Sequence, residues 1–178
     1  SRDELLNHCG GIGNIQITLS DDCRQVTVED DGRGIPLSII DENGEYNYVK
    51  LFETLFSGCN FDNSFSEETI ETIGQNGCGQ CVTAETSIFY RATEYKNNIA
   101  REVTYHNGCL EREYKEFKSD KEHGTKTEFI LDDTVYTDVV FNSEYIRDYI
   151  KKIASTSRNI NYTFYHKDEI YHFKYVSI

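Results

Sequence analysis

The chain has 178 residues and a formal net charge of −13, with 18 Lys and Arg against 31 Asp and Glu. That length suits one domain, which would bury about two thirds of the surface of its unfolded chain. An aromatic content of 13% is too high for a disordered acidic segment, and no apolar run approaches the roughly 18 residues of a membrane span. The charge disfavours a groove for nucleic-acid phosphates, although backbone N–H groups can still hold a small anion.

The first half of the chain mixes short helices and strands. Residues 1–8 are expected to form the end of a helix, because two leucines precede a Gly-Gly stop. Apolar and polar side chains then alternate over 15–19 and 26–28, a pattern typical of strands. An apolar stripe at helical spacing predicts a helix over 46–57. We expect the polar, acidic segment 58–73 that follows to be a mobile loop.

The second half is richer in strands. A helix running to about Thr86 leads into four strand-like segments with short turns between them, which predicts an antiparallel meander. These segments are residues 87–95, 98–108, 109–117 and 124–131. A helix is expected over 142–157, with one apolar face formed by Tyr145, Ile146, Tyr149, Ile150 and Ile153. Two strands, 159–166 and 170–178, complete an α+β fold in which one mixed, mostly antiparallel sheet is covered on one face by helices.

The six cysteines indicate a reducing compartment, which we take to be the cytoplasm. Cys78 and Cys81 form a C-x-x-C pair, but a zinc site would need a second pair with similar spacing, and the sequence has none. We therefore expect free structural thiols and no metal site built on cysteine.

Three glycine-containing motifs could bear chemistry. In Asp30-x-Gly32-x-Gly34 a carboxylate at a strand end can accept a hydrogen bond from an exocyclic amine, while the glycines allow close approach to a flat ring. An acidic hairpin turn would explain the same residues. The motif Gly74-x-x-Gly77-x-Gly79 before a helix can cradle a phosphate with its N–H groups, although a flexible loop would also suit it. The third, Gly124-Thr125, would add a hydroxyl beside the carboxylate.

Taken together, in this order, the motifs resemble the ATP-binding fold shared by gyrase, MutL, histidine kinases and the large chaperone ATPases. The segment from Val28 to Pro36, VEDDGRGIP, is similar to the D-x-G-R-G-I-P segment of type IIA topoisomerases. The segment LFETLFSGCNFDN and the strand start GTKT also follow that family. The resemblance covers nearly the whole chain and points to the B-type subunits of gyrase and topoisomerase IV.

The resemblance implies an adenine pocket built on two residues. Asp30 would receive the adenine amine, and the Thr125 hydroxyl would help to hold it through water. The wall and apolar contacts of the ring would come from Gly34, Ile35, Pro36 and Leu51.

The resemblance also implies a phosphate segment and a pocket mouth. The phosphate-contacting residues would be Gln75, Asn76, Gly77 and Gly79. The residues at the mouth would be Glu4, Arg33 and Arg101.

Several family features are missing from this sequence. The family's catalytic Glu and magnesium-binding Asn would precede Ser1, so we expect neither a catalytic residue nor a metal ligand within the chain. Asn60 stands where the family has a loop Lys, and Ile73 replaces a Gly. We therefore expect residues 1–178 to be a single ATP-binding domain that is cut within its first helix and lacks the transducer domain.

The resemblance thus implies an ATP-binding domain whose parent, a type IIA topoisomerase B-type subunit, uses ATP and Mg2+ to pass double-stranded DNA. The parent would dimerise and work with an A-type subunit. The isolated chain would be a monomer that makes no membrane contact, binds adenine nucleotides or pocket inhibitors, and hydrolyses nothing measurable. The alternatives are a MutL- or histidine-kinase-like ATPase and a non-catalytic binding module on the same fold.

Overall fold

A computed structural model describes residues 1–54 and 78–175. In this part of the chain the helices are α1 (Arg2–His8), α2 (Asn47–Glu53), α3 (Gly79–Glu85) and α4 (Ser143–Ala154). The strands are β1 (Ile12–Leu19), β2 (Gln25–Asp30), β3 (Ser87–Lys96), β4 (Ile99–His106), β5 (Glu111–Lys118), β6 (His123–Leu131), β7 (Asn159–His166) and β8 (Glu169–Phe173). No helix within these residues is long and apolar enough to cross a bilayer.

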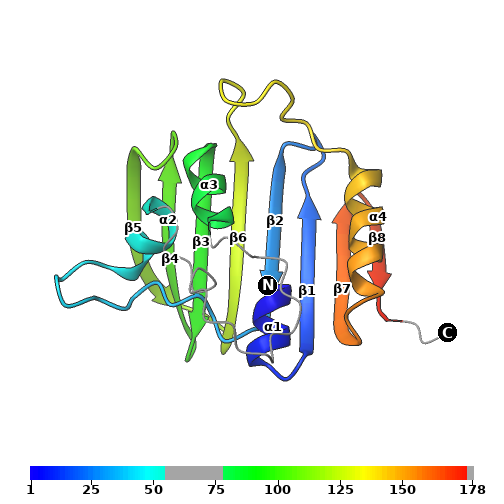
Figure 1. Ribbon diagram of the computed structural model, residues 1–178, viewed down its shortest axis with the longest axis horizontal. Helices are drawn as coiled ribbons and strands as arrows, with labels where there is room; N and C mark the ends of the chain where they lie inside the picture. The colour runs from blue at the N-terminus through cyan, green and yellow to red at the C-terminus, as the bar shows by residue number, and fades with distance from the viewer. Residues whose placement is uncertain (55–77, 176–178) are drawn as a thin grey trace, which may run out of the picture.

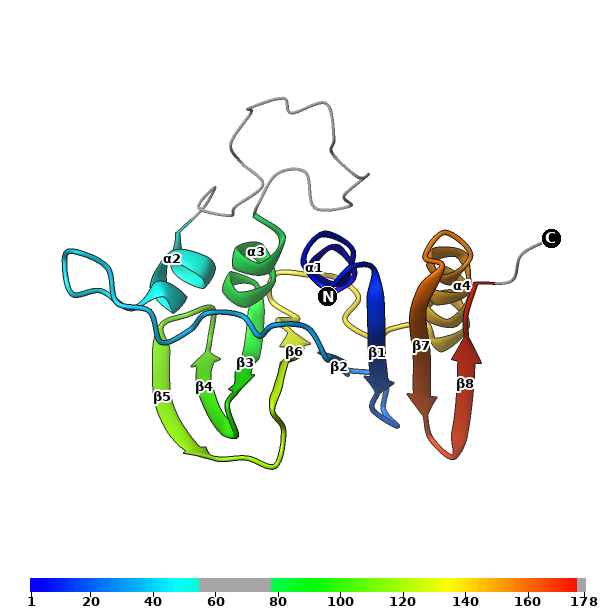
Figure 2. The same cartoon turned by 90° about the horizontal axis from the view of Figure 1, so that it is seen from below.

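The strands form one sheet in the order β5-β4-β3-β6-β2-β1-β7-β8 (Figure 1). Strands β1 and β7 run parallel, whereas the other neighbouring strands run antiparallel. Figure 2 shows all four helices on the same side of this sheet. The expected α+β class, with one mixed sheet covered on one face, is confirmed.

Side-chain alternation explains which face the helices cover. Along β1, Ile15, Ile17 and Leu19 are buried while the residues between them are exposed. They join Leu5 of α1 and Ile150 of α4 in one core cluster. A second cluster beneath α2 and α3 contains the aromatic residues Tyr48, Phe52, Tyr90 and Tyr105. Removing these apolar side chains from water supplies the main force that holds the helices on the sheet.

The register of the sheet places one row of polar residues on the helix-covered face. Asp30 pairs with Thr125, Thr125 with Glu94, Glu94 with Arg101, and Arg101 with Glu116. Paired residues on neighbouring strands point to the same face. Five strands therefore bring these five side chains, which we call the polar row, into one line across the sheet.

The expected meander is wrong at its fourth strand. Strands β3, β4 and β5 follow one another as hairpins, but β6 pairs with β3 and β2 instead of β5. Strand β5 carries alternating charges and is mostly exposed, which suits a sheet edge because such side chains oppose further pairing. Strand β3 is much more buried than β5, which suits an interior strand with a neighbour at each edge.

Two helix expectations also need correction. Helix α2 ends at Glu53 because Thr54 is extended (φ −121°, ψ 117°); residues 55–57 of the expected helix and the expected loop 58–73 lie outside the described residues. On α4, Tyr145 and Tyr149 do not belong to the packing face, since they are 71% and 48% exposed and stack on each other. The side of α4 that packs carries Ile146, Ile150, Ile153 and Ala154.

Candidate functional site

Asp30 is the last residue of β2 and is only 6% exposed. Its Oδ1 accepts a hydrogen bond from the Gly32 amide at 2.9 Å, and its Oδ2 accepts one from the Ser1 hydroxyl at 2.6 Å. The short turn through Gly32 thus supplies a backbone donor to a carboxylate that is nearly out of water. A carboxylate has about four acceptor positions, so Asp30 retains capacity for a further donor.

Thr125 lies beside Asp30 and connects the sheet to the segment Gly34–Leu37. Its Oγ1 accepts a hydrogen bond from the Ile35 amide at 3.0 Å. Gly34 has a φ of +88°, and a Cβ there would lie 2.9 Å from the Tyr95 carbonyl oxygen. Only glycine combines that backbone conformation with so close an approach. The Asp30, Thr125 and Gly34 predicted from the motifs are therefore neighbours in the fold.

The residues predicted to contact the adenine ring differ in burial. Ile35 and Leu51 are both partly buried and pack against the second core cluster, whereas Pro36 is exposed. Gly79 begins α3 and is exposed, and a Cβ added to it would have no atom within 4 Å. Gln75, Asn76 and Gly77 lie outside the described residues.

Glu4, in the first turn of α1, forms the expected pair with Arg33. The Arg33 Nε and Nη2 atoms lie 2.7 and 3.1 Å from the two Glu4 carboxylate oxygens. Burial alone would raise the pKa of Glu4, but the hydrogen bonds and charge of Arg33 outweigh it and lower this pKa. The Arg33 side chain remains 58% exposed, so the pair is accessible to solvent or ligand.

Arg101 lies in the polar row between two carboxylates. Its Nη1 is 3.9 Å from Glu94 Oε2, and its Nε is 3.4 Å from Glu116 Oε1. Its side chain is only 19% exposed. Much of its charge is therefore compensated within the chain, and this leaves less of it for a ligand phosphate.

Glu94 belongs to the polar row but to none of the sequence motifs. This carboxylate is only 2% exposed, and burial raises its pKa despite the opposing charges of Arg101 and Lys96. The signal was present in the alternation of β3, where Tyr90, Ala92 and Glu94 occupy the same face. An acid at an inward position of a strand is the feature that would have revealed it.

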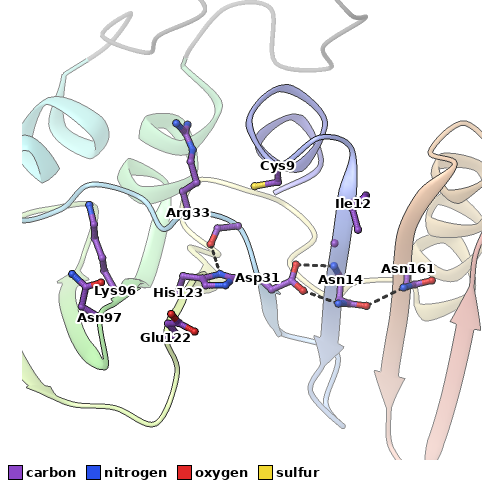
Figure 3. A pocket seen from close by; sticks show the side chains of 12 residues that line it. Cys9, Ile12, Asn14, Asp31, Arg33, Lys96, Asn97, Glu122, His123 and Asn161 are labelled. Carbon is purple, nitrogen blue, oxygen red and sulfur yellow. Dashed lines mark hydrogen bonds between the residues drawn. The ribbon is translucent and has the colours of Figure 1, made fainter.

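A hollow of about 700 Å³ lies beside the Asp31–Arg33 turn, between the β3–β4 turn and strands β1 and β7 (Figure 3). Asp31 accepts hydrogen bonds from the Asn14 amide (2.7 Å) and side chain (2.6 Å), and Asn161 donates to Asn14 at 3.0 Å. The hollow is lined by these residues among others, but neither Thr125 nor Gly34 lines it. The hollow therefore adjoins the predicted ring pocket without coinciding with it.

The described cysteines Cys9, Cys23, Cys78, Cys81 and Cys109 are all free. This agrees with the expected thiols, including the C-x-x-C pair. Cys59 is outside the described residues. Across residues 1–54 and 78–175, no group of three or more His, Cys, Asp or Glu side chains could hold a metal ion.

Comparisons with known proteins show which family the chain resembles. Residues 3–135 match the family model described as histidine kinase-, DNA gyrase B-, and HSP90-like ATPase. The chain is 30% identical over 166 residues to the B subunit of DNA gyrase from Mycoplasma pneumoniae, covering 92% of this chain and 25% of that protein.

Two further relatives show the same pattern. The B subunit of DNA topoisomerase 4 from Mycoplasma capricolum is 28% identical, over 90% of this chain and 24% of its own length. The B subunit of DNA gyrase from Enterococcus faecalis is 26% identical with the same coverage of each chain. The chain thus spans about a quarter of the length of these relatives. Since the family model matches well over half of its residues, the chain belongs to the histidine kinase-, DNA gyrase B- and HSP90-like ATPase family.

Proposed function

We propose that this chain is the ATP-binding domain of a type IIA DNA topoisomerase B-type subunit. The relatives named as the B subunits of gyrase and of topoisomerase 4 support this assignment. In the parent, ATP binding and hydrolysis would drive the passage of double-stranded DNA by a dimer that works with an A-type subunit. The five free thiols of the described residues support a reducing location such as the cytoplasm.

One observation carries the proposal for ATP. The buried Asp30 carboxylate stands at the end of β2 directly opposite Thr125, and the Thr125 hydroxyl is bonded to the Ile35 amide. An acceptor held in this way suits the amino group of adenine, because a charged hydrogen bond in a dry site is strong and directional. The residues present therefore fit the base of the nucleotide.

The surroundings supply the other contacts of the proposal. Gly34, Ile35 and Pro36 would form a wall beside the ring, and Leu51 an apolar contact. The segment Gln75–Gly79 would meet the phosphates through its backbone N–H groups. The Glu4–Arg33 pair and Arg101 would border the mouth, where a pocket inhibitor could also bind.

Magnesium would neutralise phosphate charge when it accompanies ATP. Among the described residues no group of three or more His, Cys, Asp or Glu could hold a metal ion, so Mg2+ would be held largely by the phosphates of ATP and by water. Nucleotide binding without measurable turnover is the activity we propose for this chain in isolation.

Base discrimination tests the proposal. A fluorescent adenine nucleotide bound to the chain would be displaced by ATP and by GTP in separate titrations. Guanine places a carbonyl oxygen where adenine has its amine, so the Asp30 carboxylate would repel it. We expect ATP to compete at least about tenfold better, the value of one charged hydrogen bond. Equal competition would contradict the role of Asp30, and absence of binding by either nucleotide would favour a binding module that does not use ATP.

A further inference from the structure

The middle position of the polar row is occupied by a carboxylate, Glu94, which neither the predicted adenine site nor the stability of the fold explains. Glu94 follows Thr125 in the row and is 2% exposed. Among the described residues, no donor lies within hydrogen-bond distance of its Oε2. Its nearest cationic atom, Arg101 Nη1, is 3.9 Å away. A buried carboxylate with so loose a partner costs free energy that an apolar residue at this position would avoid.

Arg101 repeats this imperfect pairing. Among the described residues its buried Nε has no hydrogen-bond partner, although Glu116 Oε1 is 3.4 Å from it. The guanidinium therefore lies between an inner carboxylate, Glu94, and an outer one, Glu116, whose side chain is 47% exposed. Of these two carboxylates, Glu94 is the one that lies next to the segment Gly34–Leu37 above the sheet.

The segment Gly34–Leu37 rests directly on Glu94 and Thr125. A Cβ on Gly34 would lie 3.2 Å from the Glu94 Cγ, so this side chain borders the space beside the Gly34 Cα. The next amide, that of Ile35, donates to Thr125 at 3.0 Å. Leu37 at the end of the segment is fully buried. The position of the segment is thus defined from below by two adjacent side chains of the row, and one of them is Glu94.

We infer that Glu94 is a positioning residue of the nucleotide pocket: its side chain lies beneath the Gly34–Leu37 segment and supports it, so that Ile35 and Pro36 can border the adenine ring. This inference rests on the proposed function, because it assigns a purpose to the wall of that site. Glu94 acts through the segment and makes no contact with the nucleotide itself.

Replacing Glu94 tests this role with the conservative variant as a rescue. In Glu94→Ala the support beneath Gly34 is lost, and we expect the dissociation constant for adenosine to rise about tenfold. Glu94→Gln keeps the length and shape of the side chain and should restore affinity to within about threefold of wild type. Glu116→Ala is the matched control, since it removes the outer carboxylate of Arg101 and should leave affinity within about twofold.

Hydrogen exchange gives a second measurement that needs no nucleotide. The Ile35 amide is bonded to Thr125, so its exchange rate reports how firmly the segment sits on the sheet. We expect faster exchange of this amide in Glu94→Ala, by about tenfold or more, with the wild-type rate in Glu94→Gln and Glu116→Ala.

These measurements separate the two proposals. If the wild-type chain bound no nucleotide, the proposed function would fail while the exchange experiment still tested the support of the segment. Glu94→Ala with wild-type adenosine affinity would overturn the inference, as would an unchanged exchange rate of the Ile35 amide. Equal losses in Glu94→Gln and Glu94→Ala would also overturn it, because the shape that supports the segment is common to Glu and Gln.

Discussion

Asp30 and Glu94 are two buried carboxylates that flank Thr125 in the same row of the sheet, yet their surroundings differ. Asp30 accepts hydrogen bonds on both oxygens, from the Gly32 amide and the Ser1 hydroxyl. Glu94 has a carboxylate oxygen without a hydrogen-bond donor among the described residues, and burial raises its pKa. The burial of the two is similar, so the difference comes from the donors around them.

Because of this difference, two carboxylates in the same row can serve different purposes, one in ligand binding and one in supporting the chain. A buried carboxylate that accepts hydrogen bonds from oriented donors is held in one position, and can offer a remaining acceptor position to a ligand amine. A buried carboxylate with a cation at 3.9 Å is better explained by its contacts with the chain above it. The first arrangement suits recognition of a base, and the second suits support of the segment beside that base.

The largest expected effect concerns the segment above Glu94. Gly34→Ala introduces a Cβ at φ +88°, between the Tyr95 carbonyl oxygen and the Glu94 side chain. Backbone strain and the close contact together should lower the free energy of unfolding by about 3 kcal/mol, measured by urea denaturation. Gly44→Ala is the control, since Gly44 has a similar φ of +81° but nothing within 4 Å of the added carbon.

For Gly44→Ala we expect the free energy of unfolding to fall by about 1 kcal/mol, because this variant has backbone strain but no close contact. Equal losses in the two variants would mean that Gly34 does not rest on the sheet as closely as the structure has it.

The next effect compares the two carboxylates directly. Asp30→Ala leaves the buried Gly32 amide without its acceptor and should cost about 2 kcal/mol of stability. Glu94→Gln removes a poorly paired charge and retains the shape of the side chain, so we expect a change of at most about 1 kcal/mol. Thermal and urea unfolding measure both. A greater loss in Glu94→Gln than in Asp30→Ala would reverse the comparison.

The pH dependence of stability distinguishes Glu94 from a surface acid. The pKa of Glu94 is raised in the folded chain, so the folded state binds its proton more tightly than the unfolded state does. The stability that Glu94 contributes is therefore greatest below pH 4.5, its ordinary value, and is lost as the pH rises through its folded pKa. Glu94→Gln should remove this decline.

Glu4 should show the opposite sign. Its pKa is lowered in the folded chain, so its contribution is present above pH 4.5 and is lost as the pH falls through the folded value. Unfolding free energies of wild type, Glu94→Gln and Glu4→Gln between about pH 3 and pH 7 would show both trends. Two trends of the same sign would contradict one of these assignments.

The smallest effect concerns the pair at the pocket mouth. Although Arg33 contacts both oxygens of Glu4, its side chain is 58% exposed, so water and salt weaken the attraction. A double-mutant cycle with Glu4→Gln and Arg33→Gln should give a coupling of about 0.5 kcal/mol that declines at high salt. A coupling energy above about 2 kcal/mol would show that water screens the pair less than its exposure indicates.

Sequence patterns were sufficient to predict the local parts of this molecule. The alternation of Ile15, Ile17 and Leu19 defines the core face of β1, and Asp30 follows from a carboxylate placed where a strand ends in glycines. These features depend on residues close together in the chain. Local spacing on α4 was less informative, because Tyr145 and Tyr149 lie near the packing stripe yet face solvent.

The parts that could not be predicted depend on register between distant strands. The pairing of Glu94 with Thr125 requires β6 to lie beside β3, and the meander expected from the sequence excluded that arrangement. The support of Gly34 by Glu94 joins residues 60 positions apart, and no local pattern encodes such a contact. Family resemblance gave Asp30, Thr125 and Gly34, while Glu94 emerged only from the assembled sheet.

The most direct test of the account is a thermal-shift titration with a non-hydrolysable ATP analogue on wild type, Asp30→Asn and Asp31→Asn. Asp31 is the matched control, because it neighbours Asp30 but is bonded to Asn14 and lines the hollow beside the Asp31–Arg33 turn. A ligand that binds only the folded state raises the melting temperature with its concentration. The account predicts this rise for wild type and Asp31→Asn and its loss in Asp30→Asn, whereas an equal rise in all three proteins would contradict it.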